Sequence, residues 1–475
     1  MSGLKKSAAT NLSFAVAAQM ISMLLSVFTT LMLPKVLNKE GYGMWQLFML
    51  YASYAGVFHL GLNDGLYLRI GGKNYSELNY RSIGAQFKIG ALYETVLAIL
   101  VCGILFAIEQ DVARRLIVVE FAVYIIIMNA VNFIGFVFQA VNQTKIYSIS
   151  ILIDKLCFLV MSIVLILMGV DDYRVYTMLY IASWVIVLIY VLWVGRKFVF
   201  IRTGNWRSYL TETGENIQSG VKLLISNLAS LLILGIGRFL IDSHWDMETF
   251  ADISLAITLM NFFVNFIKQT SIILFPMLRK LEVDMQKLFY ETVDTILKII
   301  LPVILVCYLP LRTITVLWLP KYEISLEYLA ILLPICVYEG QMQILSNTYL
   351  KVLRAENSML YTNLIAMAIS VILCLVSAVV FRSVYAIVFS MTIAIHVRSL
   401  IVDNYLSKRM DLAGKHNLMV QEVLLTMLFC IGTIMLNYLV VSGISLIVYL
   451  VYVMANRKKL GAACRGFKRL MNEIA

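Results

Sequence analysis

The sequence predicts an all-α membrane protein with about 14 transmembrane helices. Hydrophobic residues make up 61% of its 475 residues and charged residues only 14%, against roughly 45–50% and about 25% in soluble globular proteins. A water-soluble chain of this length could not bury so much apolar surface. The apolar residues also fall in blocks of about 20, the length at which a helix spans a hydrocarbon core of roughly 30 Å.

Twelve of the predicted spans form two sets of six, and the last apolar block adds a hairpin. The first set covers residues 8–32, 42–60, 83–107, 116–138, 147–168 and 175–194. The second set covers residues 221–241, 253–274, 295–309, 326–349, 360–380 and 384–400. The block 418–454 would reach about 55 Å as one helix, so we expect it to turn near Asn437 or Ser442-Gly443. The segment 295–309 is short and carries Pro302, so 12 or 13 spans are the alternatives.

The positive charges predict the orientation of the chain. With 14 spans both termini lie on one side, and the segments on that side hold 25 of the 39 Lys and Arg residues, while the opposite loops hold eight. Cytoplasmic segments carry the excess of Lys and Arg in membrane proteins. We therefore expect both termini in the cytoplasm.

Short internal similarities predict a repeat. Residues 66–69 parallel 276–279 at an offset of 210, and residues 138–143 parallel 349–354 at an offset near 211. Because six helices separate the two copies, the repeat is expected to be parallel, and such lobes usually enclose a substrate pathway. The predicted organisation is a six-helix lobe at 1–195, a cytoplasmic linker at 196–220, a second lobe at 221–405, an extra hairpin at 406–456 and a basic tail at 457–475.

Motifs for catalysis are missing from the sequence. Gly72-Lys73 and Gly414-Lys415 lack the rest of a Walker A pattern, so ATP is not expected to be the direct energy source. The four His residues are scattered without metal-ligand spacing. We expect a protein that is not an enzyme, with no catalytic residues, no metal site, no organic cofactor and no nucleic-acid partner.

Weak motifs occur at Asn11-Leu-Ser, at residues 37–43, at residues 60–69 and at the helix ends near Gln139 and Arg354. Together they resemble the polysaccharide and oligosaccharide flippases of the multidrug/oligosaccharidyl-lipid/polysaccharide (MOP) exporter superfamily. The resemblance implies two six-helix lobes around a central cavity, followed here by two extra helices. The sequence departs from the family pattern at residues 60–65, where Asn63 and Asp64 add polar character to which we assign no role.

The resemblance also implies a substrate and a setting. The substrate would be an undecaprenyl-diphosphate-linked oligosaccharide, flipped from the inner to the outer leaflet by alternating access and driven by an ion gradient. The setting would be a bacterial plasma membrane, where such units feed O-antigen, capsule or exopolysaccharide synthesis. Membrane lipids, a polysaccharide polymerase and glycosyltransferases would be the partners.

Cations inside or beside the spans are candidates for binding a diphosphate, because charge-assisted hydrogen bonds suit phosphate oxygens. Each cation has an alternative explanation. Lys268 could snorkel to the interface, and Arg69 and Arg279 could be topological anchors. Arg238 could form an i,i+4 ion pair with Asp242. Polar side chains in the fourth and tenth spans could bind sugar hydroxyls or join helices. The candidate substrate-binding residues are Lys268, Gln269, Arg238, Lys155, Arg69, Arg279, Asn129, Asn132 and Gln343.

Three carboxyl groups within the spans are candidates for coupling transport to H⁺ or Na⁺, namely Glu339, Glu94 and Asp154. Placing a carboxyl group within a bilayer costs free energy, and such groups are often functional. The alternative is a protonated carboxyl that is hydrogen-bonded within the helix bundle. Adjacent helical residues face different directions, so we do not expect Asp154 and Lys155 to neutralise each other.

Two other functions remain open at this point. A cation-coupled multidrug exporter of the same superfamily would favour a net acidic cavity, whereas this sequence mixes lysine and arginine with its carboxyl groups. A membrane glycosyl polymerase or ligase would be expected to carry catalytic groups on a sizeable loop outside the bilayer. The short outer loops argue against that function.

Overall fold

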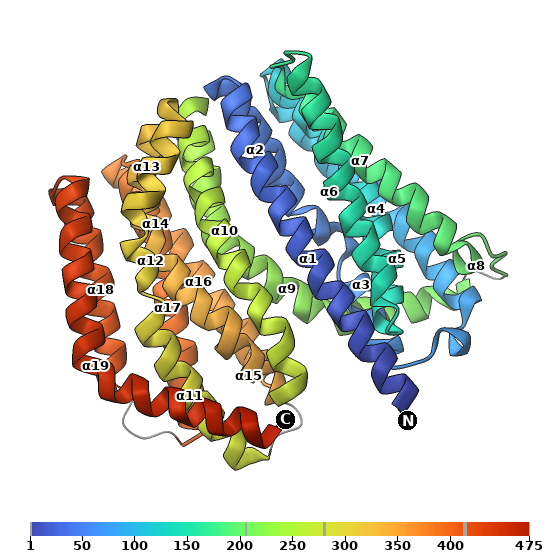
Figure 1. The fold of residues 1–475 in the computed structure, drawn as a ribbon. Coiled ribbons are helices and arrows are strands. Elements are labelled where there is room, and N and C mark those ends of the chain that lie inside the picture. Colours follow the sequence, from blue (N-terminus) through green and yellow to red (C-terminus); the bar gives the residue numbers. More distant parts are fainter. Residues whose placement is uncertain (1, 205–206, 279–281, 412–415, 475) are drawn as a thin grey trace. The chain divides into compact units, whose positions relative to one another are not determined.

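The computed structural model describes residues 2–204, 207–278, 282–411 and 416–474, and these residues fold into helices joined by short turns (Figure 1). Within these described ranges, thirteen helical segments are long and apolar enough to cross a membrane. The predicted all-α, polytopic class is therefore confirmed, with 13 spans by this criterion. The chain divides into two compact units, Met1–Leu228 and Ala229–Ala475.

Among the described residues of the first unit, five of the six predicted spans are helices long and apolar enough to cross a membrane. Its helices are α1 (Ser2–Val36), α2 (Lys39–Ser53), α3 (Leu62–Ile70), α4 (Tyr80–Ile108), α5 (Val112–Ala140), α6 (Thr144–Leu167), α7 (Tyr173–Val194) and α8 (Arg196–Val199). Helix α9 (Arg207–His244) starts in this unit and ends in the second. The predicted linker at 196–220 is therefore largely helical, and α9 continues from it into the next span without a break.

The second predicted span, 42–60, is not one continuous helix. Helix α2 ends at Ser53, a 3₁₀ turn covers Ala55–His59, and Leu60 and Gly61 follow with φ values of 52° and 93°. Two consecutive residues in the left-handed region interrupt a right-handed helix, and glycine adopts that region without steric cost. The polar segment at 60–65 thus marks a break, which the apolar pattern alone does not reveal.

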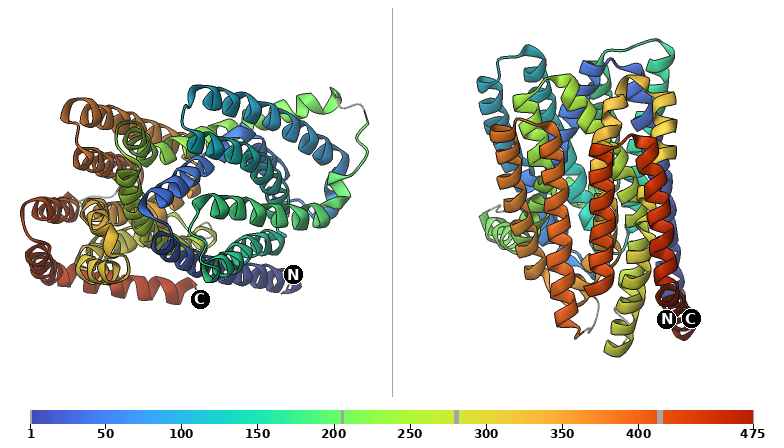
Figure 2. Two further views of the ribbon diagram at one scale, coloured as in Figure 1. Left: turned by 90° about the horizontal axis from the view of Figure 1, so that it is seen from above. Right: turned by 90° about the vertical axis from the view of Figure 1, so that its left-hand side faces the viewer.

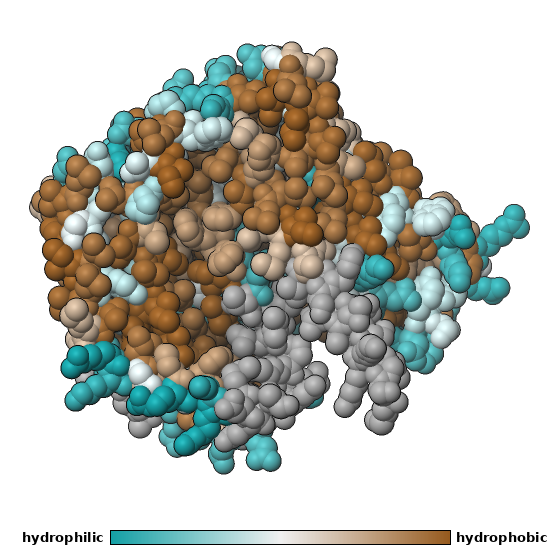
Figure 3. Space-filling model, in the orientation of Figure 1, coloured by the Kyte–Doolittle hydropathy of each residue, from teal (hydrophilic) through white to brown (hydrophobic). Residues whose placement is uncertain are grey.

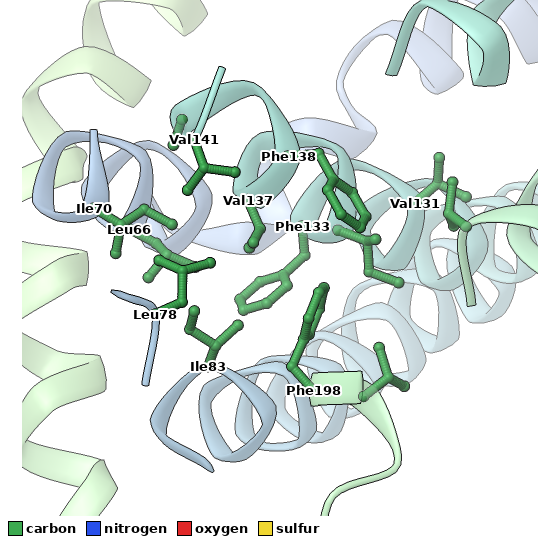
Figure 4. Close-up of a cluster of buried hydrophobic side chains, with 14 of the residues drawn as sticks. Leu66, Ile70, Leu78, Ile83, Val131, Phe133, Val137, Phe138, Val141 and Phe198 are labelled. Carbon is green, nitrogen blue, oxygen red and sulfur yellow. The ribbon is translucent and has the colours of Figure 1, made fainter. Parts of the chain in front are cut away.

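Helix α3 is held after this break by a hydrophobic cluster within the first unit (Figure 4). The cluster gathers side chains from α3, α4, α5, α7 and α8; its labelled members are Leu66, Ile70, Leu78, Ile83, Val131, Phe133, Val137, Phe138, Val141 and Phe198. Each is at most 7% exposed. Burial of this kind contributes about 1.5–3 kcal/mol for each large apolar side chain, so α3 is fixed by packing although it has only nine residues.

Glycines let α3 and α9 touch backbone to backbone. A Cβ atom on Gly65 would lie 1.8 Å from the carbonyl oxygen of Asn216, and one on Gly220 would lie 2.0 Å from that of Gly61. Real Cβ contacts are never this short, so a larger residue would force the two helices apart. The segment whose role the sequence leaves open therefore serves close helix packing.

The second unit holds the end of α9, two sets of broken helices and a C-terminal hairpin. Its further helices are α10 (Met247–Leu278), α11 (Val283–Ile300), α12 (Val303–Val306), α13 (Tyr308–Trp318), α14 (Glu323–Gln341), α15 (Asn347–Val352), α16 (Glu356–Val376), α17 (Val384–Arg409), α18 (His416–Met435) and α19 (Tyr438–Ile474). Helices α18 and α19 stand side by side (Figure 2). They turn at Leu436-Asn437, close to the first of the two predicted positions.

Two helices in this unit are longer than predicted. The span at 295–309 belongs to a longer, broken segment, Asp284–Trp318, which α11, α12 and α13 share. Pro302 interrupts it, because proline lacks the N–H that would continue the helix. Helix α17 likewise runs nine residues past the predicted end at 400, to Arg409.

The same turn ends one helix in each unit, which supports the predicted repeat. Asn142 and Arg354, 212 positions apart, both have positive φ. The N–H groups of Asn142 and Gln143 donate to the carbonyls of Gln139 and Phe138, and those of Arg354 and Ala355 donate to Lys351 and Leu350. Both sets of bonds form a Schellman motif, at an offset within two residues of those read from the sequence.

The contact between α3 and α9 gives a first prediction. Gly65→Ala should lower the thermal unfolding temperature of the purified protein, at a cost of about 1–3 kcal/mol, because the new methyl group meets the Asn216 carbonyl. Gly214→Ala, on α9 with open space around its Cβ position, should stabilise by about 0.5–1 kcal/mol. Equal shifts for the two variants would rule out the close backbone contact.

Candidate functional site

Asp154 and Lys155, two candidate residues on α6, form a direct ion pair. Lys155 Nζ lies 2.9 Å from Asp154 Oδ2, and Ser183 of α7 donates to Asp154 Oδ1 at 2.9 Å. Our expectation that the two side chains would not neutralise each other was wrong. The four-carbon stem of lysine is long enough to turn back past its neighbour, where Nζ also lies 5.8 Å from the centre of the Tyr180 ring. Asp154 is therefore paired and only 5% exposed.

Glu339 on α14 is paired as well, with a residue of a different helix that lies 59 positions later in the sequence. Arg398 of α17 forms a short ion pair with Glu339, and Gln343 donates to the same carboxyl group at 2.6 Å. Arg398 also donates to Ser230 of α9 at 2.9 Å. Arg398 lies at the end of the predicted span 384–400 and was not among the candidates, although its side chain is only 4% exposed. The Glu339 network therefore joins three helices of the second unit.

A second buried network surrounds Lys298 of α11. Its Nζ lies 3.1 Å from Asp294 Oδ2 and 2.8 Å from Asp403 Oδ2, and the lysine side chain is 2% exposed. Tyr290 donates to the other oxygen of Asp403 at 3.0 Å. Glu422 of α18 is within electrostatic range of Lys298 and accepts a short hydrogen bond from Gln341. Three carboxyl groups thus gather around one ammonium group in the apolar core of the unit.

Glu94 differs from the other two candidate carboxyl groups. It is 4% exposed on α4, and among the residues that the structure describes no side chain or backbone group forms a hydrogen bond or ion pair with it. Its carboxyl group lies against Gly90, one turn earlier on the same helix. Burying a carboxyl group without a partner costs free energy. Of the three candidate carboxyl groups, Glu94 is therefore the one whose surroundings best fit an ion-binding role.

The polar residues of α5 lie against the break in the second span. Asn129 is fully buried and donates to the carbonyl oxygen of Ala55 at 2.9 Å. Asn132 contacts the sulfur of Met128 one turn away. Asn129 therefore satisfies a backbone group that the break leaves open, and the alternative of a structural role fits it directly.

Two polar residues beside this break, Asn63 and Asp64, were noted in the sequence but left without a role. Asn63 is completely buried, and neither side-chain atom finds a hydrogen-bond partner among the described residues. Asp64 lies 3.9 Å from His59, and burial raises the pKa of Asp64 to about 6. The glycines on either side of them, Gly61 at the turn and Gly65 within α3, were the available signal.

Arg69 and Arg238 are engaged by neighbours within their own units. Arg69 lies 3.4 Å and 3.2 Å from carboxyl oxygens of Glu212 and Glu215 on α9. Arg238 donates to Ser254 at 3.1 Å and lies over the ring of Phe250. These contacts fit Arg69 as a helix-packing residue, because its partners lie beside the close contact of α3 with α9.

Lys268 and Gln269 lie in the second half of α10. The Lys268 side chain is exposed, and its charge lies within electrostatic range of Lys351 on α15. Gln269 has a buried side-chain oxygen without a hydrogen-bond partner among the described residues. Arg279 lies outside the described residues. Two neighbouring ammonium groups form a local centre of positive charge.

The structure thus brings together only some of the predicted residues: Asp154 with Lys155, and Glu339 with Gln343. The sequence did contain a signal for the Lys298 network, since Asp294 and Lys298 are oppositely charged at i and i+4. Arg398 and Asp403 were missed because the apolar pattern fades near residue 400, although the helix continues.

No family model and no curated protein matches the sequence. Solved structures do match. The lipid II flippase MurJ, in an inward closed conformation, aligns with 94% of this chain and 99% of its own at a TM-score of 0.67 and 12% identity. The chain has the MOP transporter fold. An inward-facing MATE family multidrug transporter of the MOP superfamily aligns with 84% of this chain and 100% of its own at a TM-score of 0.55 and 10% identity.

A eukaryotic MATE transporter aligns with 87% of the chain and 98% of its own, at a TM-score of 0.52 and 13% identity. Identities this low establish the shared fold alone. The fold implied by the sequence resemblance is therefore supported. The polysaccharide flippase family stays a prediction.

The Glu339 network gives a second prediction. Arg398→Met should lower the free energy of unfolding by about 3–5 kcal/mol, because it leaves a buried carboxylate without its cation. The double variant Arg398→Met with Glu339→Leu should regain most of this loss, and exposed Arg409→Met on the same helix should change it by less than about 0.5 kcal/mol. Thermal unfolding in detergent would measure all three, and a double variant as unstable as the single one would contradict the pairing.

Proposed function

We propose that this protein flips undecaprenyl-diphosphate-linked oligosaccharides from the inner to the outer leaflet of a bacterial plasma membrane. The observation that carries the proposal is the fold match to a lipid II flippase, which extends over almost the full length of both chains. A lipid-linked glycan is the substrate class that this fold relative and the sequence resemblance have in common. The units would serve O-antigen, capsule or exopolysaccharide synthesis.

The charge distribution supports an anionic substrate. Asp154 and Glu339 are each neutralised by a cation on the same or a neighbouring helix. Lys268 and Lys351 lie within electrostatic range of each other. A diphosphate offers several oxygens to two ammonium groups, so a substrate phosphate would relieve the repulsion between them.

A multidrug exporter is the second candidate, because MATE transporters share the fold. Cationic drugs would need carboxylates that are not already paired. Glu94 is the candidate carboxyl group that meets this condition among the described residues. The paired carboxyl groups favour the lipid-linked substrate over the drug.

Alternating access and ion coupling complete the proposal. We place the coupling ion, H⁺ or Na⁺, at Glu94, because an unpaired buried carboxyl group can accept either cation. No enzymatic step is needed for flipping. A polysaccharide polymerase and glycosyltransferases would act before and after transport, as separate partners.

The substrate class is tested by reconstitution. Vesicles containing the purified protein should flip a lipid-diphosphate oligosaccharide, and cells that lack the protein should accumulate such lipids in the inner leaflet. Export of a fluorescent cationic drug without lipid flipping would establish the second candidate. Polymer formation by the purified protein would establish a polymerase.

The phosphate contact gives a third prediction. Lys268→Ala should lower the flipping rate at least tenfold, since loss of a hydrogen bond to a charged group removes about 1.5–3 kcal/mol. Lys88→Ala is the control: this exposed lysine donates to the carbonyl of Ile201 at 2.7 Å, and its loss should leave the rate near the wild-type value. Equal rates for both variants at equal expression would remove Lys268 from the site.

Ion coupling gives a fourth prediction. Glu94→Gln should make flipping insensitive to the imposed H⁺ or Na⁺ gradient, because the amide keeps the shape but cannot bind the cation. Glu109→Gln, just beyond the end of the same helix, should keep the gradient dependence. Flipping by Glu94→Gln that still follows the gradient would exclude Glu94 as the coupling group.

A further inference from the structure

Helix α19 is longer than a bilayer is thick. It runs from Tyr438 to Ile474, 37 residues, and the stretch from Tyr438 to Asn456 already covers about 28 Å at 1.5 Å per residue. This matches a hydrocarbon core of roughly 30 Å. The helix therefore reaches the membrane surface near Arg457 and continues beyond it, along the part drawn in the darkest red in Figure 1.

One face of this extension packs on α11. Ala463 and Leu470 are buried, one heptad apart and in register with buried Tyr452 and Asn456. The ring of Phe467 lies 6.1 Å from that of Phe289, and Gly466 lies against Thr292. The extension is thus a docked part of the second unit with a defined inner face.

The outer face carries a dense group of cations. It contains six basic residues and no acidic one between positions 457 and 469: Arg457, Lys458, Lys459, Arg465, Lys468 and Arg469. All six are exposed. Within the described part of the chain, none of the six forms an ion pair or a hydrogen bond through its side chain. Figure 3 shows hydrophilic residues gathered over this part of α19, beside the apolar surface of the same unit.

We infer that this basic face of α19 binds the anionic phospholipid headgroups of the bilayer. The preceding span holds the cations at the membrane surface, where lipid phosphates are the nearest and most concentrated anions. Each lysine or arginine near an anionic leaflet strengthens attachment about fivefold, and the attraction fades within a Debye length. The inference goes beyond the proposed function, since it holds for any transported substrate.

A topological signal alone would explain the charges differently. The positive-inside effect acts while the chain inserts and requires no lasting contact with lipid. A headgroup-binding face requires that the folded protein respond to the charge of its lipids. The two explanations therefore differ in a measurable property of the mature protein.

Cys464 offers a probe for this response, because it is exposed in the middle of the basic face. We would label it with a nitroxide in the full-length protein, after replacing the other six cysteines by alanine. The protein would be placed in nanodiscs of phosphatidylcholine, with or without phosphatidylglycerol. The collision rate of the label with a water-soluble relaxation agent should fall at least twofold when phosphatidylglycerol is present, and salt should reverse the change.

Two matched variants locate the effect. The first neutralises four cations of α19: Lys458→Gln, Lys459→Gln, Lys468→Gln and Arg469→Gln. The second neutralises four cations in the first unit: Arg196→Gln, Lys197→Gln, Arg202→Gln and Arg207→Gln. The response to phosphatidylglycerol should be lost in the first variant and kept in the second.

Three outcomes would overturn the inference. One is a collision rate that is the same in both lipids for the labelled protein that keeps all its cations. Another is an equal response in the two variants. The third is a label that responds to added RNA or acidic protein but not to phosphatidylglycerol, which would assign the face to a soluble partner.

Discussion

The cost of placing a charge inside a bilayer governs the interior of this protein. An ionised side chain loses its water there, and only an opposite charge and well-placed hydrogen bonds offset the loss. The structure meets this requirement locally in each unit, at Asp154 with Lys155 and at Glu339 with Arg398. Each pair is completed by a serine from a neighbouring helix, Ser183 or Ser230. Helix packing and charge pairing are therefore parts of the same arrangement.

The sequence predicts the fold well because hydrophobicity and length decide where helices cross a membrane. Features that depend on backbone conformation were harder to predict. The break after Ser53 lies within an apolar stretch, and its signals, Gly61 and Gly65, acquire meaning only when α9 lies against them. The end of α17 was placed too early because charged residues interrupt its apolar pattern. Arg398 and Asp403 look like loop residues until their partners on other helices are known.

The candidate site was less accessible to sequence reasoning than the fold. A sequence identifies charged residues within spans, but it does not reveal which of them already have partners. The structure shows that Arg69 contacts two glutamates of α9 and that Asp154 is neutralised. It leaves Glu94 as the buried candidate carboxyl group without a partner among the described residues. Pairing thus narrows the list of functional candidates more than position along the helix does.

The Lys298 network also links the C-terminal hairpin to the rest of the second unit. Glu422 of α18 lies within electrostatic range of Lys298, and Tyr452 of α19 donates to the Lys298 carbonyl at 3.0 Å. Without the hairpin this side of α11, which packs against α18 and α19, would face lipid, where the charges of Asp294 and Lys298 would be costly. The hairpin is therefore part of the structure that makes these buried charges tolerable, and a chain cut before α18 should be destabilised.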